Sequence, residues 1–134
     1  MNWILHNLWS ILAYAAVFTL SIIPVPEVPE LERVPIFDKW VHFVMYGAIC
    51  CCVWLDHYRH CGTSRRVGLT VWAKTVIFPI LFGGIMELWQ AYLTTCRSGD
   101  WYDLLADSIG VFLSLPVGLF FIRPWAYRRA NRRI

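Results

Sequence analysis

Four long apolar stretches limit what this 134-residue chain can fold into, because each approaches the length of a membrane-spanning helix. A spanning helix takes about 20 mostly apolar residues to cross a hydrocarbon core about 30 Å thick. Hydrophobic residues make up 58% of the chain, more than ordinary soluble domains contain. The first stretch lacks a basic start and a small-residue cleavage site, so we interpret it as a retained helix. We predict one all-α domain over residues 1–134, a four-helix transmembrane bundle with helices at 3–23, 39–56, 71–95 and 103–123.

Charged residues are distributed unevenly between the segments that join these stretches. The first and third joining segments lean acidic, whereas the second holds three arginines and the tail at 124–134 holds four. By the positive-inside rule we predict that both termini are cytoplasmic and that the acidic segments face outward. Contact with anionic lipid headgroups explains a basic tail that directly follows a span, so we predict no nucleic-acid partner. Aromatic residues near the helix ends, Trp54 among them, predict belts at the two membrane surfaces.

The five cysteines do not indicate a disulfide framework or a metal centre. Cys50, Cys51 and Cys52 are consecutive, and consecutive helical residues point about 100° apart, so they cannot share one ion. The motif "HYRHC" places His57, His60 and Cys61 at metal-like spacing, but no fourth ligand is apparent and structural zinc takes four. We predict that the three consecutive cysteines are small packing residues and that no dedicated metal site is present.

A stripe of small residues in the fourth stretch predicts close packing against another helix. Gly110, Ser114 and Gly118 recur at intervals of four, a spacing that lets two helix backbones approach each other. Gly83 and Gly84 in the third stretch offer a matching surface. We therefore predict that the third and fourth helices pack together through these glycines.

Ionisable residues gather at one end of three predicted helices, the end that the charge pattern places outside. In "DKWVHFVMY" the polar side chains lie three or four residues apart, so they share one helix face. The third and fourth helices place carboxylates at the same depth. A charge inside a bilayer costs several kcal/mol unless it is paired or hydrated, so such residues are functional candidates. The candidate residues are Asp38, Lys39, His42, Tyr46, Glu87, Gln90, Arg97, Asp100, Asp103 and Asp107.

Two interpretations of this cluster remain open. The first is a salt-bridge network that holds the bundle together and caps the fourth helix. This suits Asp100 and Asp103, because "SGDWYD" has the pattern of an N-cap followed three residues later by an acid. The second is a functional site, which suits His42, Glu87 and Asp107, because they lie deeper in the predicted span.

Three motifs in order, "DKWVHFVMYG", "ELWQ" and "RSGDWYDLLADSIG", resemble the VanZ-like family of small bacterial integral membrane proteins. The family pattern is Asp-Lys-x-x-His-Phe, then Glu-x-x-Gln, then an Arg followed by Asp-x-x-x-Asn-x-x-Gly. The resemblance runs from Asp38 to Gly110, and Asp107 stands where the family usually has Asn. It implies a multi-pass protein of the bacterial cytoplasmic membrane. The founding member is associated with teicoplanin resistance, which implies a link to glycopeptide tolerance.

The candidate residues fit three classes of function. A binding protein would hold an anionic envelope lipid, such as a polyprenyl-phosphate-linked precursor, with Lys39 and Arg97 on its phosphate. An enzyme acting on such a lipid would use His42 as general acid or base, with carboxylates that orient it and that hold a divalent cation such as Mg²⁺. A proton-relay or structural accessory protein would need no catalysis. We expect an outward-facing site that binds or modifies an envelope lipid. The expected catalytic groups are His42, Glu87, Asp103 and Asp107, and the expected substrate-binding groups are Asp38, Lys39, Tyr46, Gln90, Arg97 and Asp100.

Overall fold

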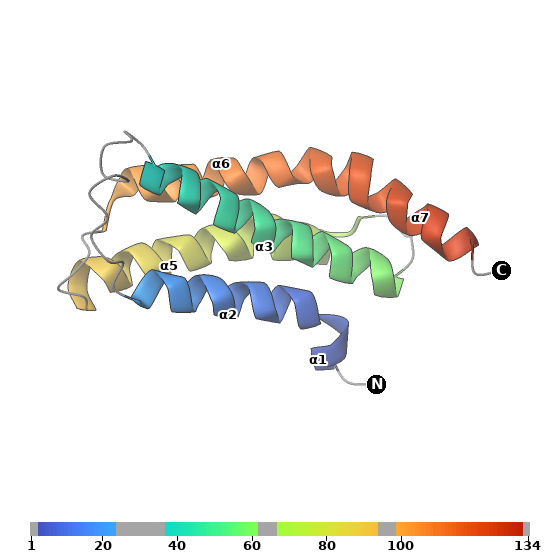
Figure 1. Ribbon diagram of the computed structural model, residues 1–134, viewed down its shortest axis with the longest axis horizontal. Helices are drawn as coiled ribbons and strands as arrows, with labels where there is room; N and C mark the ends of the chain where they lie inside the picture. Colours follow the sequence, from blue (N-terminus) through green and yellow to red (C-terminus); the bar gives the residue numbers. More distant parts are fainter. Residues whose placement is uncertain (1–2, 24–36, 62–66, 94–98, 133–134) are drawn as a thin grey trace.

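The computed structural model describes residues 3–23, 37–61, 67–93 and 99–132 of the chain. Within these ranges the chain is almost entirely helical and has no strand, which confirms the all-α class. The helices form four rods that lie side by side (Figure 1). The rods are, in order, α1 (Trp3–His6) with α2 (Leu8–Ile22), α3 (Phe37–Cys61), α4 (Leu69–Trp72) with η1 (Ala73–Ile77) and α5 (Phe78–Leu93), and α6 (Trp101–Val117) with η2 (Gly118–Ile122) and α7 (Arg123–Asn131).

The rods differ in detail from the predicted helices. The first is broken at Asn7, where the side-chain amide donates to the carbonyl of Trp3 at 3.0 Å and ends α1. The remaining α2 has 15 residues and rises about 22 Å at 1.5 Å per residue, less than a bilayer core. The second rod extends beyond the predicted 39–56 at both ends. The fourth continues through a π-helical turn, so most of the basic tail predicted for 124–134 is helical. The predicted helix end at residues 94 and 95 lies outside the described residues.

Helix α3 contacts each of the other three rods and makes the most extensive contacts in the bundle. Its most extensive packing is against α6 and then against α2. Figure 1 shows α1 and α7 at one end of the bundle, and the ends of α2 and α5 together with the starts of α3 and α6 at the other. The first and last described helices therefore lie at the same end.

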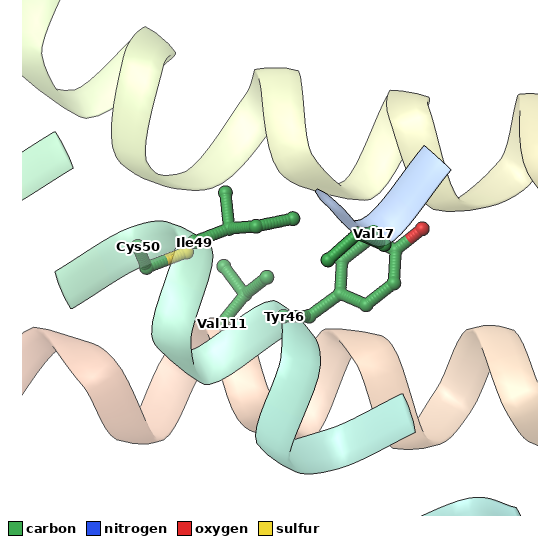
Figure 2. Close-up of a cluster of buried hydrophobic side chains, with 5 residues drawn as sticks. All are labelled: Val17, Tyr46, Ile49, Cys50 and Val111. Carbon is green, nitrogen blue, oxygen red and sulfur yellow. The ribbon is translucent and has the colours of Figure 1, made fainter. Parts of the chain in front are cut away.

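The apolar core lies around the middle of α3, where Figure 2 shows side chains from three rods meeting. The Cys50 thiol belongs to this core and donates to the carbonyl oxygen of Thr75 at 3.2 Å. Pro79 has no N–H with which to make the α-helical bond to the Thr75 carbonyl, and the thiol provides a donor in place of that bond. Cys50, Cys51 and Cys52 are free, and the packing role predicted for Cys50 is confirmed. The core cluster is Val17, Tyr46, Ile49, Cys50 and Val111.

The close approach predicted for the small residues of the fourth stretch is made with α3 rather than with α5. A Cβ at Gly110 would collide with the backbone carbonyl of Phe43 and lie 3.1 Å from the nitrogen of Gly47. The predicted pairing with Gly83 and Gly84 is therefore wrong. Gly84 has nothing within 4 Å of its side-chain position, and Gly83 faces a polar side chain of α6. The tight crossing of α3 and α6 brings the polar residues of the two helices, one turn away, into contact.

The surface is unusually apolar and the interior unusually polar. Among the described residues, ten buried polar or charged side chains match ten buried apolar ones. Large apolar side chains such as Leu81 (59% exposed) and Phe112 (54% exposed) point outward along the rods. Trp54, which was predicted for a surface belt, has 0% exposure and packs inside. Soluble monomers rarely expose apolar patches of this extent, so the surface suits an apolar surrounding.

Two rods, Leu69–Leu93 and Trp101–Asn131, are long and apolar enough to span a membrane. In each rod only 28% of the most apolar 18-residue segment is buried, whereas the core helix of a soluble protein is mostly buried. Helix α2 is too short to span a membrane, and α3 is long enough but less apolar than these two rods. The charged and polar residues of α3 lower its mean hydropathy, and two of them, His42 and Asp56, are buried inside the bundle.

Candidate functional site

The predicted site residues converge at the end of the bundle where α3 and α6 begin and α5 ends, which we call the acidic end. Nine of the ten predicted residues are described, and Arg97 lies outside the described residues. The arrangement follows from helix spacing, because positions four apart on α3 present their side chains to α6. The titratable groups of the acidic end are Asp38, Lys39, His42, Glu87, Asp100, Asp103 and Asp107.

Lys39 joins the start of α3 to the start of α6. Its Nζ lies 2.9 Å from Asp100 Oδ2 and 2.7 Å from Asp103 Oδ1. Asp100 also caps α6, because its Oδ1 accepts the backbone N–H of Tyr102 at 2.9 Å. The Lys39 ammonium and this N–H hold the pKa of the Asp100 carboxyl below its usual value. The capping role expected for Asp100 is therefore present, and Lys39 has one further N–H to offer.

His42 and Asp107 form a buried pair below this ion pair. His42 Nδ1 lies 3.0 Å from Asp107 Oδ1, and the two side chains are 5% and 0% exposed. The second oxygen of Asp107, Oδ2, has no hydrogen-bond partner although it is fully buried. It lies against the backbone of α5, because a Cβ at Gly83 would be 2.8 Å from it. A larger residue at Gly83 would displace this carboxylate.

Glu87 links the end of α5 to the start of α6. Its Oε2 accepts the backbone N–H of Asp100 at 2.8 Å, and the residue is 6% exposed. Gly99, just before α6, packs closely against the backbone of Glu87, since a Cβ at Gly99 would lie 2.6 Å from the Glu87 carbonyl oxygen. Glu87 also joins His42 and Asp107 in a group whose potential ligand atoms lie within 4.8 Å of one another. The three residues come from three different rods.

The remaining predicted residues lie around this group. Asp38 is exposed, and it forms a second group with His42 and Asp103 within the same 4.8 Å limit. Tyr46 is 1% exposed and belongs to the apolar core below the site. Gln90 donates to the backbone carbonyl of Ser21 at 3.1 Å, a contact that ties α5 to α2.

Sequence reasoning missed a buried carboxylate at the opposite end of the bundle. Asp56 is 3% exposed, and its Oδ2 accepts both the backbone N–H of Ser10 at 2.8 Å and the Ser10 hydroxyl at 2.7 Å. Asp56 follows His42 by 14 residues, about 21 Å along α3. The rule that selected the other carboxylates, a charge near an apolar stretch, would also have found it.

The histidines near Asp56 line one cavity, and the side chain of Cys61, the third member of "HYRHC", lies outside the described side chains. His60 stacks on His6 with ring centroids 4.2 Å apart, and both line a cavity of about 340 Å³ that also contacts Asp56 and Lys74. Among the described residues, the groups that could hold an ion all lie at the acidic end.

Comparisons of this chain with protein-family models, with curated proteins and with solved structures found no match.

Proposed function

We propose that this chain is a multi-pass, VanZ-like integral membrane protein of the bacterial cytoplasmic membrane, with its acidic end facing outward and its termini in the cytoplasm. The exposed apolar side chains of α5 and α6 support burial of the bundle in lipid. The placement of α1 and α7 at one end fits an even number of crossings.

The opposite end of the bundle, where α3 ends and α7 carries arginines, supports the same orientation. Two adjoining grooves between the end of α3 and α7 share Leu55, Trp125 and Arg129 as lining residues. The Arg129 guanidinium lies 5.4 Å from the centre of the Trp125 ring. Aromatic rings and arginines at one level are typical of the cytoplasmic membrane surface, where anionic lipids attract basic residues.

We further propose that the acidic end binds or modifies the headgroup of an anionic envelope lipid and so contributes to glycopeptide tolerance. The observation that carries this proposal is the buried His42–Asp107 pair. A carboxylate that holds one imidazole nitrogen fixes the orientation of the ring and favours proton exchange at the other nitrogen. Lys39, whose side chain is 29% exposed, would offer its remaining N–H to a phosphate oxygen, together with Arg97.

A proton relay is the second candidate function. The unpartnered Oδ2 of Asp107 and the buried Glu87 favour it, because neighbouring buried carboxylates readily share and pass protons. In this case the acidic end would need no lipid substrate, and the Lys39 ion pairs would only hold α3 to α6.

Lipid binding by the purified chain in nanodiscs tests the first proposal against the second. We expect tighter binding of a polyprenyl phosphate than of a zwitterionic phospholipid, and a loss of this preference in a Lys39→Met, Arg97→Gln double variant. Arg97→Lys should weaken binding, because a single ammonium does not replace the planar guanidinium fork. Asp56→Asn, at the opposite end of the bundle, is the matched control. Equal binding of both lipids by the parent, combined with proton flux across liposomes, would favour the relay.

A further inference from the structure

His42, Glu87 and Asp107 form a buried group whose side chains are of the types that bind metal ions. One imidazole and two carboxylates come from α3, α5 and α6, and all three residues are buried. Their potential ligand atoms lie within 4.8 Å of one another. Neighbouring ligand atoms around a tetrahedral zinc ion are about 3.4 Å apart for bonds of about 2.1 Å, so a small contraction would suffice.

The hydrogen bonds at this group leave one carboxylate oxygen without a partner. The Asp100 backbone N–H reaches Glu87, and His42 reaches only one oxygen of Asp107. Asp107 Oδ2 is fully buried and has no donor, although polar atoms in such places are almost always paired. Because Gly83 places the α5 backbone against this oxygen, no side chain at that position can supply a donor. A bound cation would provide this oxygen with the partner that it lacks.

We propose that His42, Glu87 and Asp107 form a binding site for a single divalent transition-metal ion, of the class of Zn²⁺ or Mn²⁺. The imidazole ligand favours such ions, whereas Mg²⁺ and Ca²⁺ prefer oxygen ligands alone. Three protein ligands leave at least one position for water or for a phosphate oxygen. The site rests on the membrane-embedded acidic end proposed above, but cation binding itself requires no lipid.

A second group, Asp38, His42 and Asp103, shares the same histidine. It is the weaker candidate because Asp38 is exposed and Asp103 already accepts the Lys39 ammonium at 2.7 Å. The two groups make different predictions, since Asp103→Asn changes only the outer group, and Asp107→Asn and Glu87→Gln change only the inner one.

Metal binding by the full chain in detergent tests the inference. The protein is purified with a tag that lacks histidine, stripped with a chelator, and titrated separately with Zn²⁺, Mn²⁺ and Mg²⁺, with bound metal measured by mass spectrometry of the dialysed protein. We expect one equivalent of Zn²⁺ or Mn²⁺ per chain, bound at least 100-fold more tightly than Mg²⁺. Asp107→Asn and Glu87→Gln should each weaken binding at least tenfold, whereas Asp103→Asn and the buried control Asp56→Asn should leave it within threefold.

Absorption spectra with saturating Co²⁺ provide a second measurement that does not depend on the yield of a variant. Ligation by His42 should produce visible absorption bands in the parent, and Glu87→Gln should shift or remove them. The inference is overturned if no ion binds with one-to-one stoichiometry, if Asp107→Asn and Glu87→Gln bind as the parent does, or if only Asp103→Asn loses binding. Lipid selectivity is measured separately on metal-free and metal-loaded protein. A chain that binds the ion but does not prefer anionic lipid would refute the proposed function and leave the metal site standing.

Discussion

Replacing Asp56 by alanine should destabilise the bundle by about 2–4 kcal/mol, because this buried carboxylate holds the start of α2. The first N–H groups of a helix have no partner within it. The N-cap residue of α2, Asn7, makes no side-chain capping bond. Asp56 instead caps α2 from a neighbouring helix, since its Oδ2 accepts the backbone N–H of Ser10 at 2.8 Å and the Ser10 hydroxyl at 2.7 Å.

The magnitude follows from these two bonds. A hydrogen bond to a charged group contributes about 1.5–3 kcal/mol, and the loss of a helix cap alone costs about 0.5–2 kcal/mol. Relief from burying the Asp56 carboxylate, which is 3% exposed, offsets part of the loss. Ser10→Ala removes only the hydroxyl bond and should cost about 1 kcal/mol. Asp56→Asn keeps an acceptor and should cost less than about 1 kcal/mol, because Asn caps nearly as well as Asp.

Unfolding in mixed micelles, followed by circular dichroism as the denaturing detergent is increased, measures these differences. The Asp56→Ala and Ser10→Ala variants form a double-mutant cycle that should show a coupling of about 1 kcal/mol, since each removes a partner of the other. Ser108→Ala is the matched control, because the Ser108 hydroxyl bonds only to a carbonyl of its own helix. If Asp56→Ala costs no more than Ser10→Ala, or if the two effects simply add, the cross-helix cap does not hold α2.

Four shorter predictions follow from the acidic end and from the topology. In a cysteine-free background, Trp101→Cys should react with a membrane-impermeant label on intact cells and Arg132→Cys should not; the reverse result would invert the proposed orientation. Glu87→Gln keeps an acceptor for the α6 backbone, so protein levels in the membrane should stay near normal while glycopeptide tolerance or lipid turnover falls at least tenfold; loss of the protein from the membrane would point to a structural role instead. Gly110→Val should destabilise the fold by about 2–4 kcal/mol in the same detergent assay, because α3 leaves no room for a side chain there, and near-parent stability would contradict the tight crossing. The Asp100 ion pair should stabilise the fold above about pH 4 and lose this effect as pH falls through the lowered pKa of Asp100, so Asp100→Asn should flatten the acid limb of a stability–pH curve; an unchanged limb would show that the pair contributes nothing.

Local sequence signals predicted much of the acidic end. The intervals of three and four on α3 placed Lys39 and His42 on one face, and "SGDWYD" predicted the cap at Asp100, which accepts the Tyr102 N–H. Both results depend only on helix geometry and on the chemistry of the first helical turn. The choice of partners was not predictable in this way. Lys39 pairs with Asp100 and Asp103 only because α3 and α6 cross closely, and that crossing depends on packing between distant segments.

Several helix boundaries also depended on tertiary contacts. No Gly or Pro marks the break at Asn7, which lies beside the cross-helix cap made by Asp56. The basic composition after Arg123 indicated a tail, yet α7 begins at Arg123, and the proline at 124 is well tolerated in the first turn of a helix. Tryptophan is common at membrane interfaces, but Trp54 is buried where Gly118 of η2 leaves space for its ring. At the start of α2 and at Trp54 a neighbouring rod decided the outcome.

The aspartate at position 107 gives the metal proposal a physical basis in this chain. An asparagine there would present an amide oxygen and an NH₂ group, and could pair with its surroundings without any added charge. Asp107 presents two acceptors, of which His42 satisfies one and nothing satisfies the other. An aspartate in this buried place requires either a proton or a cation, and Glu87 within 4.8 Å increases that requirement. Asp107→Asn should therefore remove metal binding while increasing stability in the metal-free protein, a combination that neither a salt-bridge network nor a pure packing role would produce.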